Sequence, residues 1–276
     1  YAVESAIAGS GAQPVRQMPQ RGTGHAVQQV VPHLADVAEA EAAERAGVEL
    51  LSVPPAMIMD RQFRDAAPTA FAFPGDNFYE IGDTADFLKW AFPLFKNGAD
   101  GFYCSGSLQT VRAMADHALP VCGHVGLIPS KRTWTGGFKA VGKTLDSAKR
   151  VWEACVALQD AGAFAVEIEV VPQSITDAIA EKTGLFLISM GAGAAGHAQY
   201  LFSDDVLGQN TGHIPRHAKV YADFAAEQDR LQTLRIEAMG RFARDVHRGD
   251  YPAPQYLVDC DSEVVQAFRD WLDSTG

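Results

Sequence analysis

The sequence lacks the features that mark several large classes of protein. No stretch approaches the roughly 20 uninterrupted apolar residues of a membrane-spanning helix, so we expect no membrane partner. Basic residues are outnumbered, with 23 Lys and Arg against 34 Asp and Glu, and the net charge is −11. That balance argues against nucleic acid as a partner, because binding it normally requires a basic face. No segment recurs at a fixed period, which argues against a repeat architecture.

Cysteine is scarce and scattered. The four cysteines, at positions 104, 122, 155 and 260, make neither a C-x-x-C pair nor a compact disulfide ladder, so a cytoplasmic, reducing compartment is expected. Residues 1–24 lack the basic-then-apolar layout of a signal peptide, and we expect them to form a flexible, polar leader. Residues 25–276 are then predicted to form a single barrel domain with a C-terminal helical extension.

From residue 25 onward, short apolar runs alternate with longer amphipathic ones, the order that produces parallel strands covered by helices. The expected strands span residues 26–31, 48–53, 70–73, 101–104, 121–125, 164–170, 185–189 and, as a short eighth, 206–207. The expected helices span 34–46, 86–96, 107–117, 145–161 and 175–182, followed by a long charged one at about 218–246 and a last one near 262–273. Eight such steps without an early G-x-G-x-x-G predict a (β/α)8 TIM barrel, with an open doubly wound sheet as the alternative.

A barrel of this kind carries its chemistry at the carboxyl ends of its strands. Glu167 and Glu169 share one face of the sixth expected strand, because side chains alternate with a period of two. One of them is a candidate general base, since desolvation at a barrel mouth raises the pKa of a carboxyl group; an ion-paired structural glutamate is the alternative. His124 ends the fifth expected strand and faces the same mouth, either as a catalytic group or as a hydrogen-bonded core histidine.

Glycine-rich loops and one thiol are further candidates. Gly191 and Gly193 belong to a glycine-rich loop that could let the backbone approach a ligand closely or place a phosphate at a helix N-terminus. Residues 136–139 form a candidate lid, for which a plain surface turn is the more frequent explanation. Cys122 is a nucleophile by residue type, but nothing in the neighbouring sequence lowers its pKa, so we favour a small buried thiol.

Five segments carry a resemblance to a known family. They are PVCGHVGLIPS (120–130), WTGGFKAVGK (134–143), EIEVVP (167–172), MGAGAAGHAQYLFSDDVLG (190–208) and GHIPRHAKVY (212–221). In order and spacing they resemble the ketopantoate hydroxymethyltransferases, over residues 45–252 and most strongly from Pro120 on. The resemblance implies a (β/α)8 barrel of the phosphoenolpyruvate/isocitrate lyase-like superfamily. It also implies transfer of a one-carbon unit from methylenetetrahydrofolate to 2-oxoisovalerate, a small 2-oxo acid, with Mg2+ as cofactor.

The resemblance also implies roles for individual residues. Glu169 corresponds to the base that removes the C3 proton of the substrate, and His124 to the histidine near the bound keto acid. Tyr103 and Ser105 occupy the family's substrate-binding lysine and acidic metal-site positions, and with Gly191 and Gly193 they are the candidate substrate-binding residues. In the family, a metal chelated by the keto acid stabilises the enolate.

The side of the site that holds the metal in the family is changed in this sequence. The family's Gly-Asp-Ser corresponds to residues within SVPPA (52–56), and Pro55 takes the Asp position. Asp76 lies within one residue of the family's second metal-binding aspartate and is the candidate metal ligand. Because Mg2+ prefers oxygen ligands, the loss of two carboxylates, at positions 55 and 105, predicts weak Mg2+ binding.

Three functions remain open at this point. The first is a hydroxymethyltransferase-like enzyme, a C–C bond-forming transferase or aldolase acting on a 2-oxo acid, with Glu169 as base. The second is a C–C lyase or hydrolase of the same superfamily. The third, motivated by the altered metal side, is a ligand-binding paralogue without catalysis.

The helical stretch after Ala218 adds an expectation about assembly. A barrel already has its ring of helices, so the apolar residues Val220, Phe224, Leu231, Leu234 and Met239 must pack on the barrel or against another subunit. We expect a homo-oligomer, as the resemblance also implies. A helix folded back on its own barrel is the alternative.

Overall fold

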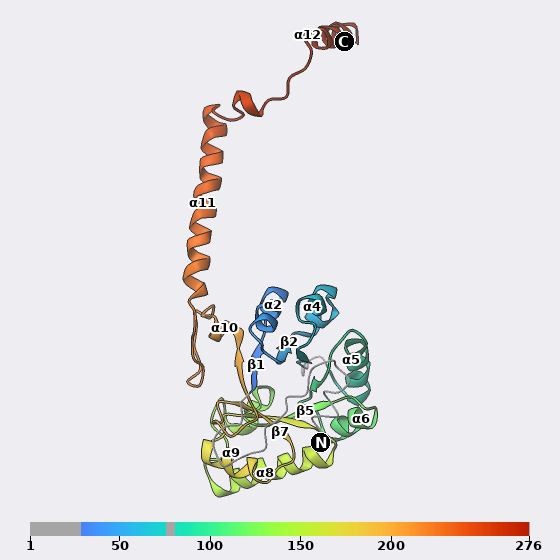
Figure 1. Cartoon of the computed structure of the whole chain (residues 1–276), viewed down its shortest axis with the longest axis vertical. Coiled ribbons are helices and arrows are strands. Elements are labelled where there is room, and N and C mark those ends of the chain that lie inside the picture. The colour runs from blue at the N-terminus through green and yellow to red at the C-terminus, as the bar shows by residue number, and fades with distance from the viewer. Residues whose placement is uncertain (1–28, 76–80, 276) are drawn as a thin grey trace. The chain divides into compact units, whose positions relative to one another are not determined.

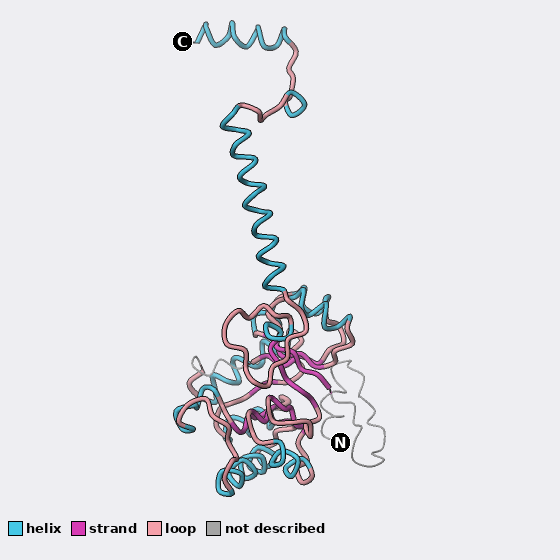
Figure 2. The backbone as a smooth tube through the Cα atoms, turned by 90° about the vertical axis from the view of Figure 1, so that its left-hand side faces the viewer, coloured by secondary structure: helices cyan, strands magenta, loops and turns pink. Residues whose placement is uncertain are grey.

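A computed structural model of the chain describes residues 29–75 and 81–275. The chain divides into two compact units, one ending at Asp223 and one beginning at Phe224. The first unit contains the strands, with helices around them, and the second is helical (Figures 1 and 2). The expected leader and the first part of the first expected strand lie outside the described residues.

Eight strands form one parallel sheet. They are β1 Gln29–His33, β2 Leu50–Val53, β3 Phe71–Pro74, β4 Phe102–Tyr103, β5 Val121–Gly126, β6 Ala165–Glu169, β7 Phe186–Met190 and β8 Ala198–Phe202. Their spatial order is β3-β2-β1-β8-β7-β6-β5-β4, so the first and last strands of the sequence are neighbours. Between β3 and β4, the backbone N–H groups of Asp100 and Gly101 donate to the carbonyl of Ala72 at 3.0 and 3.3 Å. The sheet is therefore a nearly closed (β/α)8 TIM barrel, which confirms the predicted fold class.

Helices connect most of the strands. They are α2 Val37–Arg45, α3 Pro55–Met59, α4 Arg61–Ala66, α5 Thr84–Lys96, α6 Leu108–Asp116, α7 Arg132–Thr135 (preceded by the 3-10 turn η1 Pro129–Lys131), α8 Leu145–Asp160, α9 Gln173–Ala180 and α10 Ser203–Val206. Side chains cap the longer ones: Asp36, Asp83, Ser107 and Thr144 each accept a hydrogen bond from the backbone N–H three residues on. The helices α3, α4, α7 and α10 were not predicted, because helices of four to six residues are too short to show a helical period.

The eighth strand was predicted in the wrong place. Residues 206–207 do not form a strand, and α10 covers the first of them; the strand is β8, residues 198–202. Parallel neighbours normally need a crossover of a dozen or more residues, whereas β7 and β8 are joined by residues 191–197 alone. The signal for β8 is the alternation in which Ala198 and Tyr200 are buried and Gln199 and Leu201 are not.

Two sets of buried apolar residues hold the barrel together. One lies between the sheet and the helices, and the other fills the interior of the barrel. The interior is aromatic: the rings of Phe71 and Phe73 are 4.7 Å apart, and those of Phe73 and Tyr103 are 5.3 Å apart. Because these rings fill the middle of the barrel, a ligand has room only toward an open end.

Gly126 ends β5 at the point where β6 also ends. Its φ is +86°, and a Cβ there would lie 2.3 Å from the carbonyl oxygen of Glu169. The backbone N–H of Leu127 donates to the same carbonyl at 2.9 Å. A glycine is therefore required both for the backbone angle and for the close approach of the two strand ends.

We expect Gly126→Ala to lower the free energy of unfolding by about 3 kcal/mol, because it combines backbone strain with a clash against β6. Gly137→Ala is the matched control, since Gly137 also has a positive φ (+108°) but a Cβ there meets nothing within 4 Å. Its expected loss is about 1 kcal/mol, and urea denaturation measures both. Equal losses in the two variants would contradict the argument from close approach.

The second unit contains α11 Phe224–Arg248, the 3-10 turn η2 Pro254–Tyr256 and α12 Ser262–Thr275. Both predicted C-terminal helices are present, although α11 begins six residues later than expected. No residue of α11 or α12 is buried. Of the helices in the described ranges, none combines the length and the apolar character needed to cross a lipid bilayer.

Candidate active site

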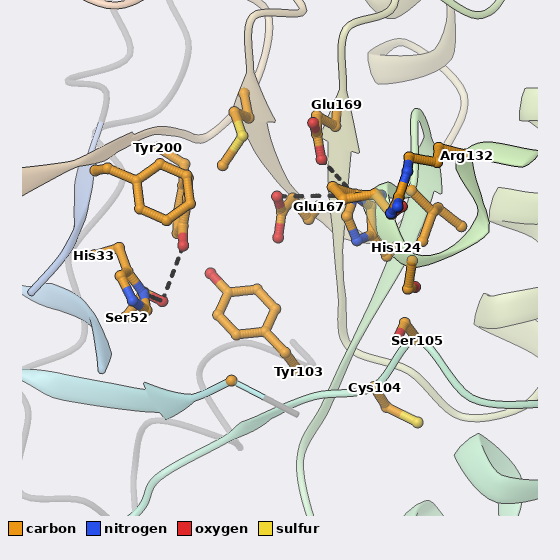
Figure 3. Close-up of a pocket in the computed structure, with 16 residues that line it drawn as sticks. His33, Ser52, Tyr103, Cys104, Ser105, His124, Arg132, Glu167, Glu169 and Tyr200 are labelled. Carbon is orange, nitrogen blue, oxygen red and sulfur yellow. Dashed lines mark hydrogen bonds and ion pairs between the residues drawn. The ribbon is translucent and has the colours of Figure 1, made fainter. Parts of the chain in front are cut away.

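The carboxyl ends of the strands surround a cavity of about 440 Å³ (Figure 3). That size suits a small organic molecule. The cavity is lined by His33, Ser52, Gly75, Tyr103, Cys104, Ser105, His124, Ile128, Pro129, Ser130, Arg132, Glu167, Glu169, Met190, Tyr200 and Phe202. Of the residues named from the sequence, the structure brings Tyr103, Ser105, His124, Glu167 and Glu169 together here.

One side of the cavity carries an imidazole and two carboxylates. The pairing of β5 with β6 places His124 opposite Glu167 and Gly126 opposite Glu169. Nε2 of His124 lies 3.0 Å from Oε2 of Glu169 and 3.8 Å from Oε1 of Glu167. Both glutamates are buried, at 6% and 7% exposure, and Figure 3 shows both carboxylates directed toward the imidazole. Such a group can hold and move a proton between side chains that are largely shielded from bulk water.

The same three side chains could hold a metal ion. Their ligand atoms all lie within 4.8 Å of one another. One imidazole nitrogen with two carboxylate oxygens suits ions such as Zn2+ or Mn2+ better than Mg2+, which prefers oxygen alone.

The opposite side of the cavity carries neutral hydroxyl groups. Oγ of Ser52 lies 2.8 Å from Nδ1 of His33 and 3.1 Å from the hydroxyl of Tyr200. The buried hydroxyl of Tyr103 makes no hydrogen bond of ordinary geometry with the described residues, although Ser52 is near enough to act on it as a hydrogen-bond partner and lower its pKa. We refer to Ser52, Tyr103 and Tyr200 as the hydroxyl cluster.

Burial keeps this side of the cavity uncharged at neutral pH. It raises the pKa of both Tyr103 and Tyr200 well above the ordinary tyrosine value, and the charge of Glu167 raises them further. Burial also lowers the pKa of His33 below its ordinary value, although Asp204 and Glu39 act in the opposite direction. The tyrosines therefore remain hydrogen-bond donors, and the His33 ring remains neutral.

Two of the positions expected from the resemblance to surround Mg2+ supply no carboxylate. Pro55 begins α3 and has no ligand atom in its side chain, and Ser105 has only a neutral hydroxyl and a carbonyl that accepts from Nζ of Lys131 at 2.6 Å. The carboxylates that line the cavity, Glu167 and Glu169, belong to the group around His124. Asp76, the candidate metal ligand, lies outside the described residues.

Gly191 and Gly193 are not among the residues that line the cavity. Both have positive φ, and a Cβ at Gly191 would lie 2.6 Å from His217. The carbonyl of Gly193 accepts hydrogen bonds from Ser189 and Gln199 at 2.7 and 3.0 Å, which fixes the short connection between β7 and β8. Their expected role in substrate binding stays a prediction.

Sequence analysis did not single out His33, Ser52, Tyr200 or Arg132 as functional. His33 was missed because the first strand extends two residues beyond its predicted end, and Tyr200 because β8 was taken for a loop. Ser52 was named only as part of SVPPA (52–56), the segment that corresponds to the family's Gly-Asp-Ser. The signals that find these three are the position of His33 and Ser52 at the carboxyl ends of the apolar runs of β1 and β2, and the alternation within β8. Arg132 lies in the short helix α7 that follows β5, and no periodic pattern in the sequence marks it.

Three of the four thiols are buried, and Cys260 is exposed. Burial raises the pKa of Cys155 to about 12, and burial together with the charge of Glu167 raises that of Cys122 well above the ordinary value. A protonated, buried thiol is a poor nucleophile, which favours the structural interpretation of Cys122.

We expect one thiol of the native protein to react rapidly with a disulfide reagent such as DTNB at pH 8. That thiol is Cys260. The raised pKa values of Cys122 and Cys155 keep both thiols protonated at pH 8, and burial blocks access to Cys104. Absorbance at the released thiolate's band counts the reacting groups, and all four should react after unfolding in urea. Cys260→Ser should abolish the rapid reaction; rapid reaction of two or more thiols would contradict the assignment.

A barrel with an acid–base group at the carboxyl end of its strands defines a class, the (β/α)8 barrel proteins whose chemistry lies at that end. Comparison with known proteins places the chain more narrowly. Residues 78–254 match the family model of ketopantoate hydroxymethyltransferase. The chain belongs to this family.

Curated relatives agree with that assignment. The 3-methyl-2-oxobutanoate hydroxymethyltransferase of Nitratidesulfovibrio vulgaris (strain DP4) is 33% identical over 201 residues, which are 72% of this chain and 63% of the relative. The enzyme of the same name from Deinococcus radiodurans is 33% identical over 256 residues, which are 83% of this chain and 87% of the relative. The chain thus spans less than two thirds of the first relative's length.

Solved structures support the fold. A structure of oxaloacetate acetylhydrolase in complex with the product oxalate has a TM-score of 0.50 with this chain, at 13% identity. The match covers 81% of this chain and 93% of that one. At this identity the likeness concerns the barrel fold alone.

Proposed function

We propose that this chain is a hydroxymethyltransferase-like enzyme that joins a one-carbon unit to C3 of a 2-oxo acid. The observation that carries the proposal is the 3.0 Å contact between His124 and Glu169 at the mouth of the barrel, in a chain of this family. The relatives' name gives 3-methyl-2-oxobutanoate (2-oxoisovalerate) as the first substrate to test.

Glu169 is the proposed base. Its carboxylate takes the C3 proton of the bound 2-oxo acid, the electron pair of the C–H bond forms a C2–C3 double bond, and the carbonyl oxygen becomes negative. C3 then attacks the carbon of formaldehyde, either free or released from methylenetetrahydrofolate when one water molecule replaces both of its C–N bonds to that carbon. A new C–C bond forms, and the π electron pair of formaldehyde moves to its oxygen. The proton held by Glu169 goes to that oxygen and completes the hydroxymethyl group.

The neighbours of Glu169 position it and the substrate. His124 holds the Glu169 carboxylate at 3.0 Å, and Glu167 faces the same imidazole nitrogen at 3.8 Å. Arg132 lines the cavity, and we assign its guanidinium to the carboxylate of the 2-oxo acid, which a planar fork of donors matches. One nitrogen of this guanidinium donates to the carbonyl of Pro129 at 3.2 Å, which restrains it at the cavity wall.

We expect Glu169→Gln to slow exchange of the C3 hydrogen of 2-oxoisovalerate with D2O by about 100-fold or more, because an amide cannot accept that proton. Proton NMR measures the exchange without a one-carbon donor. Glu153→Gln, an exposed position on α8, is the matched control and should exchange as the unchanged protein does. Equal rates in the two variants would contradict the role of Glu169.

The alternatives are separate outcomes of the same assays. If the unchanged protein neither exchanges C3 nor forms a product with formaldehyde or methylenetetrahydrofolate, the hydroxymethyltransferase proposal fails. Cleavage of a malate-like or 2-substituted oxo acid would then identify a lyase or hydrolase. Thermal stabilisation by a 2-oxo acid without turnover would identify a binding protein.

For Mg2+, we propose weak binding, because positions 55 and 105 supply no carboxylate. Calorimetry should detect no tight Mg2+ site in the full chain. A tight site would contradict this, and Asp76→Asn would then tell whether the position inherited from the family contributes to it.

We also propose that the chain forms a homo-oligomer. Helices α11 and α12 have no buried residue, yet they expose Leu231, Leu234, Ile236, Met239, Phe242, Val264, Phe268, Trp271 and Leu272. Apolar side chains at this density favour a protein partner, and a second copy of the chain needs no further component. The proposed compartment is the cytoplasm, where the four scattered cysteines stay reduced.

Light scattering at micromolar concentration tests the assembly. We expect a mass that is a multiple of 29.7 kDa. Leu234→Asp should shift the mass toward that of one chain, because a charge at an exposed apolar position of α11 opposes burial in an interface. A mass near 29.7 kDa for the unchanged protein would reject the oligomer.

A further inference from the structure

The hydroxyl groups on the neutral side of the cavity suit a specific role in the proposed reaction. Removal of the C3 proton leaves negative charge on the carbonyl oxygen, which something in the site must stabilise. We infer that the hydroxyl cluster, through Tyr103 and Tyr200, stabilises this oxygen by hydrogen bonds, in place of a metal ion at the family's position. The inference rests on the proposed function and adds the chemistry that completes it.

The first support is the hydroxyl of Tyr103. Its oxygen is buried, and no described residue makes a hydrogen bond of ordinary geometry to it, although Ser52 lies close beside it. Such a group is rare, because a buried hydroxyl without a partner loses its hydration and gains nothing in return. Figure 3 shows it directed into the cavity, between Ser52 and Tyr200 on one side and Glu167 on the other. A ligand oxygen in this space would supply the missing acceptor.

The second support is the chain of hydrogen bonds behind Tyr200. His33 Nδ1 contacts Ser52 Oγ at 2.8 Å, and Ser52 Oγ contacts the Tyr200 hydroxyl at 3.1 Å. If Nδ1 of the neutral ring carries the proton, it donates to Ser52, Ser52 donates to Tyr200, and Tyr200 keeps its own proton for an acceptor in the cavity. Each bond in such a chain polarises the next, which makes the last hydroxyl a stronger donor.

The third support is the placement of the two tyrosines. Tyr103 ends β4 and Tyr200 lies on β8, and their rings are 6.2 Å apart at an angle of 83°. Their hydroxyls thus approach the same part of the cavity from two directions (Figure 3). Two fixed donors aimed at one oxygen form an oxyanion hole, and fixed donors need no rearrangement when the charge develops.

The electron balance of the step requires no further reactant. As Glu169 takes the C3 proton, the C=O π electrons move to oxygen, and that oxygen accepts hydrogen bonds from Tyr103 and Tyr200. When C3 attacks the one-carbon donor, the C=O bond re-forms and the hydrogen bonds weaken. The tyrosines donate hydrogen bonds throughout and do not lose their protons.

Tyr103→Phe is the direct test, in the full chain and in the presence of EDTA. We expect C3 exchange of 2-oxoisovalerate to fall about 100-fold, the loss typical of an oxyanion donor, with the KM changed by less than about threefold. The melting temperature should stay the same or rise, because the change removes an unpartnered hydroxyl. Tyr256→Phe, at an exposed position, is the matched control and should alter none of these.

Tyr200→Phe provides a second variant. It should also slow exchange, but it should lower the melting temperature, because Ser52 loses a hydrogen-bond partner. Unchanged exchange in both variants would overturn the inference. So would loss of exchange in EDTA that a divalent ion restores, which would assign the charge to a metal, for instance at His124, Glu167 and Glu169.

A binding experiment separates this inference from the proposed function. Oxalate is a planar dianion that resembles the enolate of a 2-oxo acid, and calorimetry in EDTA measures its binding with or without turnover. If the protein shows no exchange but Tyr103→Phe weakens oxalate binding tenfold or more at unchanged stability, the hydroxyl cluster binds an oxyanion and only the proposed reaction fails. Equal oxalate binding by the two proteins would overturn the inference.

Discussion

The pairing of β5 with β6 is the interaction on which the site depends. Its register places His124 opposite Glu167 and Gly126 opposite Glu169, so that the imidazole and both carboxylates meet at the end of the barrel. A slip of one residue would turn the two glutamates to the other face of the sheet, toward the helices, where burial of a carboxylate without a partner is costly. Gly126 fixes this register at its end, because only a glycine lets β5 come so close to the carbonyl of Glu169.

The cavity combines two kinds of polar surface on opposite sides. On one side, ionisable groups on β5 and β6 are within reach of a shared proton. On the other, β2, β4 and β8 supply the uncharged hydroxyls of Ser52, Tyr103 and Tyr200. A 2-oxo acid has both an acidic C–H bond and a carbonyl oxygen that becomes negative when that bond breaks. The division of the cavity matches this division within the substrate class.

The aromatic interior sets the depth of the site. Phe73 packs against both Phe71 and Tyr103, and these rings fill the barrel below the glutamates. Tyr103 belongs both to this packing and to the site: its ring packs against Phe73, and the residue lines the cavity. The packing that stabilises the barrel thus also orients one of the proposed donors.

The sequence by itself determined the barrel and the acid–base side of the site. Period-two runs and amphipathic helices are local patterns, and strand ends in a parallel barrel converge wherever they lie in the chain, so His124 and Glu169 could be placed at one mouth. The eighth strand was predicted in the wrong place because its connection to β7 is unusually short, and Tyr200 was missed for the same reason. Only the tertiary structure decided the hydroxyl side: Ser52 and Tyr200 are 148 residues apart, and their contact depends on the pairing of β1 with both β2 and β8. No local pattern encodes such a meeting, because the closure of the whole barrel brings those strands together.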